Sequence, residues 1–244
     1  DDDFDQATIA KRNAINNYEL CNDAFGKLNV TKGTCYGNIE KIPSKNDWIA
    51  VIHADGNGLG QVVRKIGGNK EDYSYFSSQL DAATKQAAKD AFEYIREKFE
   101  WKGSIPIRPI VLGGDDFTAI CRADFAIEYA SKFIESFELR TREKIGTILE
   151  KVFTSGNVRD CLTACAGIVF VKSSFPFYFA YELAEKLCGE AKKDAKCNEA
   201  ILAGMELPAS CIMFHKVQGS FTDEWKTIIR RELTPQNNIS FVFG

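Results

Sequence analysis

Two stretches decide the predicted fold: residues 48–60, WIAVIHADGNGLG, and residues 105–121, IPIRPIVLGGDDFTAIC. In the first, an apolar run rich in β-branched residues ends at Asp55 and enters a glycine-rich turn, which is typical of a buried strand. The second contains two apolar runs, 105–112 and 116–121, joined by Gly113 and Gly114. Because glycine accepts a positive φ, this pair fits the two-residue turn of a hairpin. Prolines at 106 and 109 predict that the first hairpin strand is an edge or begins irregularly.

Helical patterns lie on both sides of this hairpin. Apolar residues recur every three or four positions over 70–101 and again over 124–150, where we expect Asp124 to be the N-cap. Further elements are predicted as a helix at 6–25, strands at 162–171 and 210–214, and helices at 176–193 and 221–232. The order strand, helix, strand, strand, helix, strand predicts an α+β, ferredoxin-like βαββαβ fold with an antiparallel sheet and helices on one face. An extra strand and helix follow. We therefore divide the chain into a lead-in, 1–47, a main domain, 48–217, and a C-terminal tail, 218–244.

Composition limits the class of protein. The 244 residues are 45% hydrophobic and 27% charged, with a net charge of −3, which is ordinary for a globular protein and gives no global attraction to nucleic acid or membrane. No apolar run approaches the roughly 18 residues that span a bilayer. The chain begins DDDFD, without a starting Met or an apolar signal region. We expect a cytoplasmic protein that is a processed product or a piece of a longer parent.

Eight cysteines, none in a C-x-x-C pair, are expected to be reduced thiols. Cys21 and Cys35 could supply two ligands of a zinc site, but no nearby Cys or His completes a set of four. The simpler interpretation is that they are small apolar residues.

Three carboxylates carry the predicted chemistry. Asp55 ends the first strand, and Asp115 with Asp116 lies at the hairpin tip. In a ferredoxin-like sheet these points are neighbours, so three like charges would converge. They would raise one another's pKa unless a cation compensates, and hard oxygen ligands suit Mg²⁺ or Mn²⁺. Two such ions about 4 Å apart can hold the attacking and the leaving oxygen of a phosphoryl displacement.

The turn after Asp55 fits the same chemistry. Its open backbone N–H groups just before a helix could hold phosphates; its residues are Gly56, Asn57, Gly58, Leu59 and Gly60. Each feature alone has a simpler interpretation: an ordinary surface turn, or a tight hairpin with solvated acids. Together, at the ends of the right strands, they favour the site. By position alone, Lys192 and Lys193 are expected to be solvated charges late in a helix. We expect His53 to be a strand residue rather than a ligand.

Three segments carry a family resemblance: HADGNGLG at 53–60, LGGDDFTAI at 112–120 and YELAEKLCGEAKKDAK at 181–196. They resemble the polymerase/cyclase palm of the large subunit of type III CRISPR effector complexes, which is related to the GGDEF diguanylate cyclases. The segment ASCIMFHKV at 209–217 is similar to the part that follows this palm. The resemblance covers about 48–217.

The resemblance implies a nucleotidyltransferase that converts ATP into cyclic oligoadenylate, or into a cyclic dinucleotide, and releases pyrophosphate. It implies two Mg²⁺ or Mn²⁺ ions held by Asp55, Asp115 and Asp116, with Gly56 as a further ligand. The nucleotide would be held by 56–60, by Gly113 and Gly114, and by Lys192, which matches the lysine that meets the triphosphate in GGDEF cyclases. Effector subunits and RNA are the implied partners, and facing palms would make a homodimer.

The sequence also departs from the GGDEF pattern. Asn57, Leu59 and Gly60 stand where the cyclases usually carry a second acid and then Phe-Lys, and Asp116 replaces Glu. These differences argue against guanine use on the diguanylate plan. The alternatives are a catalytically silent palm that serves as a regulatory or scaffold subunit of a ribonucleoprotein complex, a diguanylate-cyclase-like enzyme, or a purely structural domain with solvated acids.

Overall fold

The computed structural model describes residues 18–25, 47–100, 105–153, 159–197, 206–218 and the single position 227. Most of the predicted lead-in therefore lies outside the described residues, as do Cys35 and nearly all of the helix predicted at 221–232. Of the helix predicted at 6–25, the described part is α2, Tyr18–Phe25.

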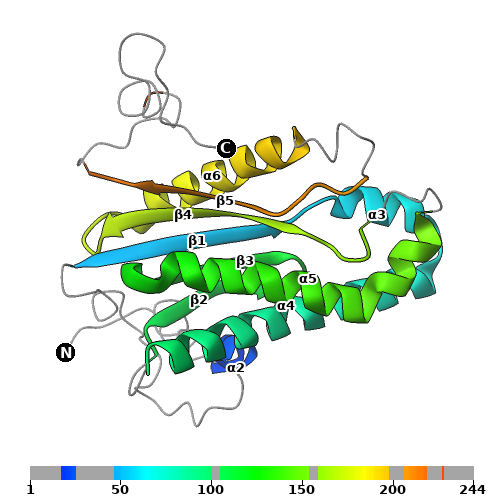
Figure 1. Ribbon diagram of the computed structural model, residues 1–244, viewed down its shortest axis with the longest axis horizontal. Helices are drawn as coiled ribbons and strands as arrows, with labels where there is room; N and C mark the ends of the chain where they lie inside the picture. The colour runs from blue at the N-terminus through cyan, green and yellow to red at the C-terminus, as the bar shows by residue number, and fades with distance from the viewer. Residues whose placement is uncertain are drawn as a thin grey trace, which may run out of the picture.

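Five strands form one sheet in the order β2-β3-β1-β4-β5 (Figure 1). Their bounds are β1 Trp48–Gly56, β2 Ile107–Gly113, β3 Asp116–Arg122, β4 Ala164–Lys172 and β5 Cys211–Lys216. β1 is central and antiparallel to both β3 and β4, and β2 pairs antiparallel with β3 at one edge. The four-strand βαββαβ core is thus confirmed, and the extra strand β5 adds to β4 in parallel.

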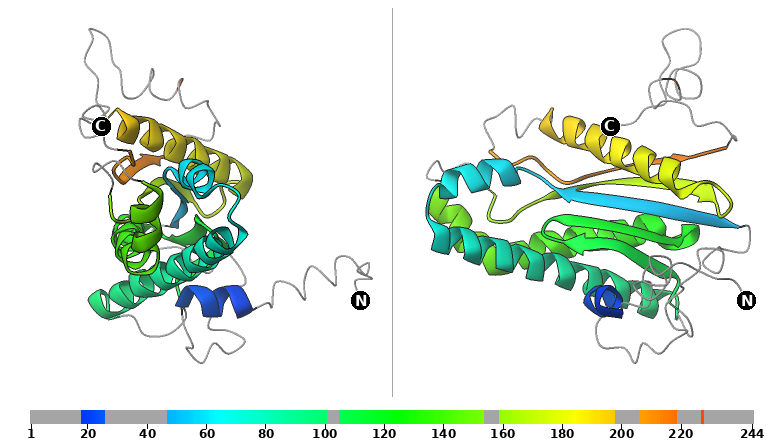
Figure 2. Two further views of the ribbon diagram at one scale, coloured as in Figure 1. Left: turned by 90° about the vertical axis from the view of Figure 1, so that its right-hand side faces the viewer. Right: turned by 180° about the vertical axis from the view of Figure 1, so that it is seen from behind.

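Helices cover both faces of this sheet, as the two views of Figure 2 show. The helices after β1 and β3 are α3 Leu59–Ile66, α4 Lys70–Lys98 and α5 Ala126–Val152, and α6 Phe177–Lys196 follows β4. The helices α4 and α5 pack on one face, as predicted, with α2 against α4. Helix α6 packs on the opposite face of the sheet, which the sequence did not predict.

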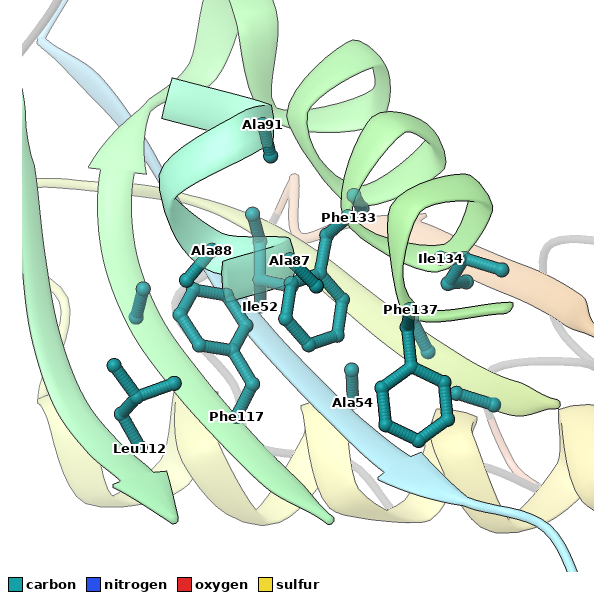
Figure 3. Close-up of a cluster of buried hydrophobic side chains, with 14 of the residues drawn as sticks. Ile52, Ala54, Ala87, Ala88, Ala91, Leu112, Phe117, Phe133, Ile134 and Phe137 are labelled. Carbon is teal, nitrogen blue, oxygen red and sulfur yellow. The ribbon is translucent and has the colours of Figure 1, made fainter. Parts of the chain in front are cut away.

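The alternation of side chains along β1 explains these two layers. Ala50, Ile52 and Ala54 point into the large cluster beneath α4 and α5, whereas Ile49 and Val51 point toward α6. Figure 3 shows the larger cluster, in which aromatic rings of β3 and α5 meet. The rings of Phe117 and Phe133 stack with centroids 4.6 Å apart. Fully buried rings of this kind each contribute about 1.5–3 kcal/mol through burial, and they fix β3 against α5.

The start of α5 corrects one prediction. Asp124 is not its N-cap; it lies within a short 3-10 turn, Ala123–Phe125, and Phe125 takes the cap position without a side-chain hydrogen bond. The Asp124 carboxylate accepts hydrogen bonds from the Arg122 guanidinium. This charge-assisted pair uses the side chain that the cap would need. In contrast, Asn69 caps α4 by accepting from the N–H groups of Glu71 and Asp72.

The hairpin turn is displaced by one residue from the prediction. Gly113 pairs with Asp116 across the strands, so the two turn residues are Gly114 and Asp115 rather than Gly113 and Gly114. Gly114 has a φ of 62°, whereas Asp115 is not among the residues with positive φ. A single positive φ, at the first turn residue, is the pattern of a type II′ turn. β2 lies at the sheet edge and its register shifts between Pro109 and Val111, which confirms the irregular edge strand.

Two composition-based expectations concern the described residues. None of the helices there combines the length and apolar character that crossing a bilayer requires. Among the described cysteines, those at 121, 161, 165 and 188 are buried. Cys21 lies on α2, so nothing here tests its pairing with Cys35 in a zinc site.

Candidate metal centre

The three predicted acids meet at one end of the sheet. Carboxylate oxygens of Asp55, Asp115 and Asp116 all lie within 4.8 Å of one another. The register explains the convergence, because Ala54 pairs with Phe117 and so places Asp55, the next residue of β1, beside the start of β3. Among the described residues this is the one such group of potential metal ligands.

A glycine after Asp55 permits this close approach. A Cβ atom at position 56 would lie 2.9 Å from the Cβ of Asp115 and 2.6 Å from the Cδ1 of Leu59. Both contacts are shorter than side-chain carbons tolerate. The absence of a side chain at Gly56 therefore lets the turn of the hairpin lie against the end of β1.

Two side chains of α4 hold the hairpin turn from the other side. Thr84, fully buried, donates from Oγ1 to the carbonyl oxygen of Gly114 at 2.5 Å. The N–H of Gly114 donates to Asp81 Oδ1 at 3.3 Å. The two peptide groups that flank Gly114 are thus tied to helix α4. Sequence reasoning missed these two residues; the available signal was a threonine within an apolar helix stripe.

The electrostatics of the group favour a cation. Burial, and then the hydrogen bond and charge of Asp55, raise the pKa of Asp115 to about 7. Burial and the charge of Asp55 also raise the pKa of Asp116, although His53 and Lys192 oppose that rise. A divalent cation bound to these oxygens would remove the repulsion, and clustered carboxylates are ligands that Mg²⁺ and Mn²⁺ prefer. The residues present therefore fit the implied ions.

The prediction that Lys192 is a solvated charge at the end of a helix is wrong. Its Nζ lies 2.5 Å from Asp55 Oδ2 and 2.9 Å from the carbonyl oxygen of Gly56, and its side chain is 23% exposed. The prediction suits its neighbour, because Lys193 is 70% exposed and pairs with Glu190 on its own helix. The sequence could not distinguish the two lysines without knowing which side of α6 lies over the sheet.

A close contact between α6 and β4 brings Lys192 to the site. A Cβ atom on Gly167 would lie 2.0 Å from the carbonyl oxygen of Ala184 and 2.6 Å from the backbone nitrogen of Cys188. Backbone therefore packs on backbone at this point, and the Cys188 thiol donates to the carbonyl of Cys165 at 3.2 Å. One helical turn further along α6, Lys192 reaches Asp55.

The glycine-rich loop has two distinct parts. Gly58, with a φ of 74°, is the N-cap of α3, and the N–H groups of Leu59 and Gly60 in its first turn have no intrahelical acceptor. Such groups can hold an anion, and the contact of this loop with phosphate stays a prediction. Asn57, by contrast, is 3% exposed. Its side-chain amide donates to Thr163 Oγ1, Cys165 Sγ and the carbonyl of Ala209, and its N–H donates to the carbonyl of Thr163.

Asn57 is buried, whereas the sequence predicted that it belongs to the part of the loop that holds phosphates. Its donors tie the loop to the start of β4 and to the segment before β5, so it positions the loop from inside the protein. His53 lies in β1 as predicted, with Nδ1 3.0 Å from Thr118 Oγ1, and is not one of the clustered potential ligands. Gly113 and Gly114 lie beside Asp115, and their predicted contact with nucleotide stays a prediction.

Comparisons with known proteins agree with this fold. The family model described as Cas10/Cmr2, second palm domain, matches residues 48–201. No curated protein matches the chain. Among solved structures, a Csm1–Csm4 cassette in complex with AMPPNP is 17% identical with a TM-score of 0.41, and the match covers 60% of this chain and 20% of that one. The active GGEEF domain of a diguanylate cyclase from Vibrio cholerae is 14% identical, with a TM-score of 0.36, and the match covers 68% of this chain and 83% of that domain.

Proposed function

Because the chain belongs to the Cas10/Cmr2 second palm domain family, we propose that it is a metal-dependent nucleotidyltransferase in CRISPR-type antiviral defence. It would join ATP into a cyclic oligoadenylate, or into a cyclic dinucleotide, and release pyrophosphate. The observation that carries the proposal is the group of three carboxylates, Asp55, Asp115 and Asp116, with oxygens within 4.8 Å of one another.

The residues of the chain would supply the metal ligands and the groups that bind the triphosphate. The three carboxylates and the Gly56 carbonyl oxygen would hold two Mg²⁺ or Mn²⁺ ions. Bound there, the ions would make the attacking hydroxyl easier to deprotonate and would hold the charge of the departing pyrophosphate. The N–H groups of Leu59 and Gly60 at the N-terminus of α3 would bind triphosphate oxygens. Lys192 would add a positive charge from α6.

The bonds made and broken balance in one displacement. A ribose 3′-hydroxyl (or 2′-hydroxyl) oxygen of one nucleotide forms a bond to the α-phosphorus of another. The bond from that phosphorus to the pyrophosphate oxygen breaks, and the hydroxyl proton leaves to solvent. Carboxylates in fixed positions would keep the cations in place, so that the negative charge that develops on the pyrophosphate would meet positive charge already in position. The proposal also includes partner subunits and RNA of the effector complex, or a second palm that supplies the second nucleotide.

A product assay tests this function. The purified chain is incubated with α-³²P-labelled ATP or GTP and Mn²⁺ or Mg²⁺, with products separated by chromatography. The Asp115→Asn/Asp116→Asn variant is compared with Asp160→Asn, which changes an exposed acid that pairs with Arg142. We expect a cyclic product from ATP with the unchanged chain and Asp160→Asn, and none with the double variant.

The other outcomes separate the alternatives. A product made from GTP instead of ATP would identify a diguanylate-cyclase-like enzyme. A chain that binds ATP in a metal-dependent way but makes no product, even after addition of effector subunits and target RNA, would be a regulatory palm. Loss of both turnover and binding would contradict any role of the carboxylates in nucleotide chemistry.

A further inference from the structure

Lys192 contacts two oxygen atoms that the proposed metal site also needs. Its ammonium nitrogen lies 2.5 Å from Asp55 Oδ2 and 2.9 Å from the carbonyl oxygen of Gly56. One is a carboxylate of the clustered triad and the other is the carbonyl at the end of β1. We propose that Lys192 is an internal competitor of the divalent cation, and that metal binding displaces its ammonium group from these oxygens and makes it available to the anionic substrate. This inference rests on the proposed function.

Geometry makes the two cations mutually exclusive at this point. Mg²⁺ binds oxygen at about 2.0–2.1 Å, so an ion shared by the same two oxygens would occupy nearly the position of the Lys192 nitrogen. Two positive charges there would also repel strongly in a half-buried site. The ammonium group must therefore move before the ion binds both oxygens.

The fold limits how far the ammonium group can move. Helix α6 is held by its backbone contact with β4 at Gly167 and by the thiol hydrogen bond of Cys188, one turn before Lys192. The Cα of Lys192 consequently stays in place, while its flexible stem lets the charge swing. In the metal-free chain the lysine neutralises part of the carboxylate charge; in the metal-bound chain it can bind triphosphate. Metal would then bind before nucleotide, because it frees the Lys192 ammonium group for the triphosphate. A triphosphate bound to Lys192 would in turn keep the ammonium group away from the oxygens that bind the metal.

The neighbouring lysine provides a matched control. Lys193 is the next residue of α6, carries the same charge, is 70% exposed and pairs with Glu190 rather than with the triad. Lys192→Met and Lys193→Met thus remove the same charge from adjacent positions, and only the first removes a contact with Asp55.

Amine labelling of the nucleotide-free chain tests the displacement directly. The chain is treated briefly with an acylating reagent, with and without saturating Mn²⁺, and acylation of each lysine is measured by mass spectrometry. We expect Mn²⁺ to raise the labelling of Lys192 several-fold and to leave Lys193 unchanged. Equal or lower labelling of Lys192 with Mn²⁺ bound would overturn the proposal while leaving the proposed function intact.

Metal affinity provides the second measurement. Free Mn²⁺ is followed by electron paramagnetic resonance during titration of the unchanged chain and both methionine variants. We expect Lys192→Met to bind Mn²⁺ on the order of tenfold more tightly, because a close opposing charge is removed, and Lys193→Met to change the affinity far less. An affinity of Lys192→Met equal to or below that of Lys193→Met would overturn the competition. If neither the unchanged chain nor Lys192→Met binds Mn²⁺, both the competition and the proposed function fail.

Discussion

Gly56 and Asp115 approach so closely that a methyl group at position 56 would lie 2.9 Å from the Cβ of Asp115. The proposed metal site therefore depends on a missing side chain as much as on the three carboxylates. The end of β1 and the tip of the hairpin lie this close only because no side chain separates their backbones at this point.

The first prediction follows from this contact. Gly56→Ala should push Asp115 away from Asp55, lower Mn²⁺ affinity by on the order of tenfold or more and cost about 1–3 kcal/mol of stability through overpacking. Titration calorimetry and urea unfolding measure the two effects. Gly68→Ala is the control, since a Cβ there meets nothing within 4 Å. Equal Mn²⁺ binding by the two variants would show that the close approach does not matter.

The backbone contact between α6 and β4 predicts opposite effects for two glycines. Gly167→Ala should destabilise the chain by about 1–3 kcal/mol or more, because the new methyl group would overlap the carbonyl of Ala184. Gly189→Ala, in open space on α6, should stabilise it by about 0.5–1 kcal/mol, the usual gain for alanine within a helix. Chemical denaturation of both variants gives the comparison. A neutral Gly167→Ala would contradict the close helix–sheet packing.

The hydrogen bond from Thr84 to the hairpin turn predicts a separate effect. Thr84→Val keeps the shape of the side chain but removes the donor to the Gly114 carbonyl. We expect a loss of about 1 kcal/mol of stability from an unpaired, partly buried acceptor, together with weaker Mn²⁺ binding. Ser78→Ala, an exposed hydroxyl on the same helix, should change neither. Unchanged stability and metal binding in Thr84→Val would mean that the turn holds its shape without α4.

The raised pKa of Asp115 predicts a pH dependence with a definite sign. In the folded, metal-free chain this pKa is about 7, whereas an unfolded aspartate has a pKa of about 3.9. Between these values the folded state binds more protons, so the Asp115 contribution lowers stability as pH rises from about 4 to about 7, and levels off above. Asp115→Asn should remove this component and be the more stable protein at about pH 8.

Urea unfolding in the presence of a chelator, at about pH 5 and about pH 8, measures this difference. The free energy of unfolding of the unchanged chain should fall relative to Asp115→Asn between the two values. A constant difference between the two proteins would contradict the raised pKa. Adding Mn²⁺ should reverse the order at the higher pH, because only the unchanged chain keeps all three carboxylates.

Local patterns predicted most of the fold because they report burial directly. The apolar run of β1, the stripe of α4 and the glycine hairpin placed Asp55, Asp115 and Asp116 correctly at one end of the sheet. The turn was displaced by one residue because both Gly113 and Gly114 accept a positive φ, and only the pairing of Gly113 with Asp116 decides between them.

The remaining features depend on packing between elements that are distant in sequence. Periodicity shows that α6 has a buried face, but not which face of the sheet receives it, so it could not separate Lys192 from Lys193. The family resemblance, rather than the residue pattern, singled out Lys192. Asn57 lies in a loop composition typical of exposed turns, yet its amide is buried against residues more than 100 positions later. No local signal reports such a contact.

We propose above that three carboxylates form a divalent-cation site that binds nucleotide. Crystals of the chain grown with Mn²⁺ and a non-hydrolysable ATP analogue would test it most directly, through the anomalous scattering of manganese. We expect two manganese peaks about 4 Å apart, in contact with Asp55, Asp115 and Asp116, and neither peak in the Asp115→Asn/Asp116→Asn variant. Bound analogue with no manganese among these three residues, or peaks that persist in the variant, would contradict it.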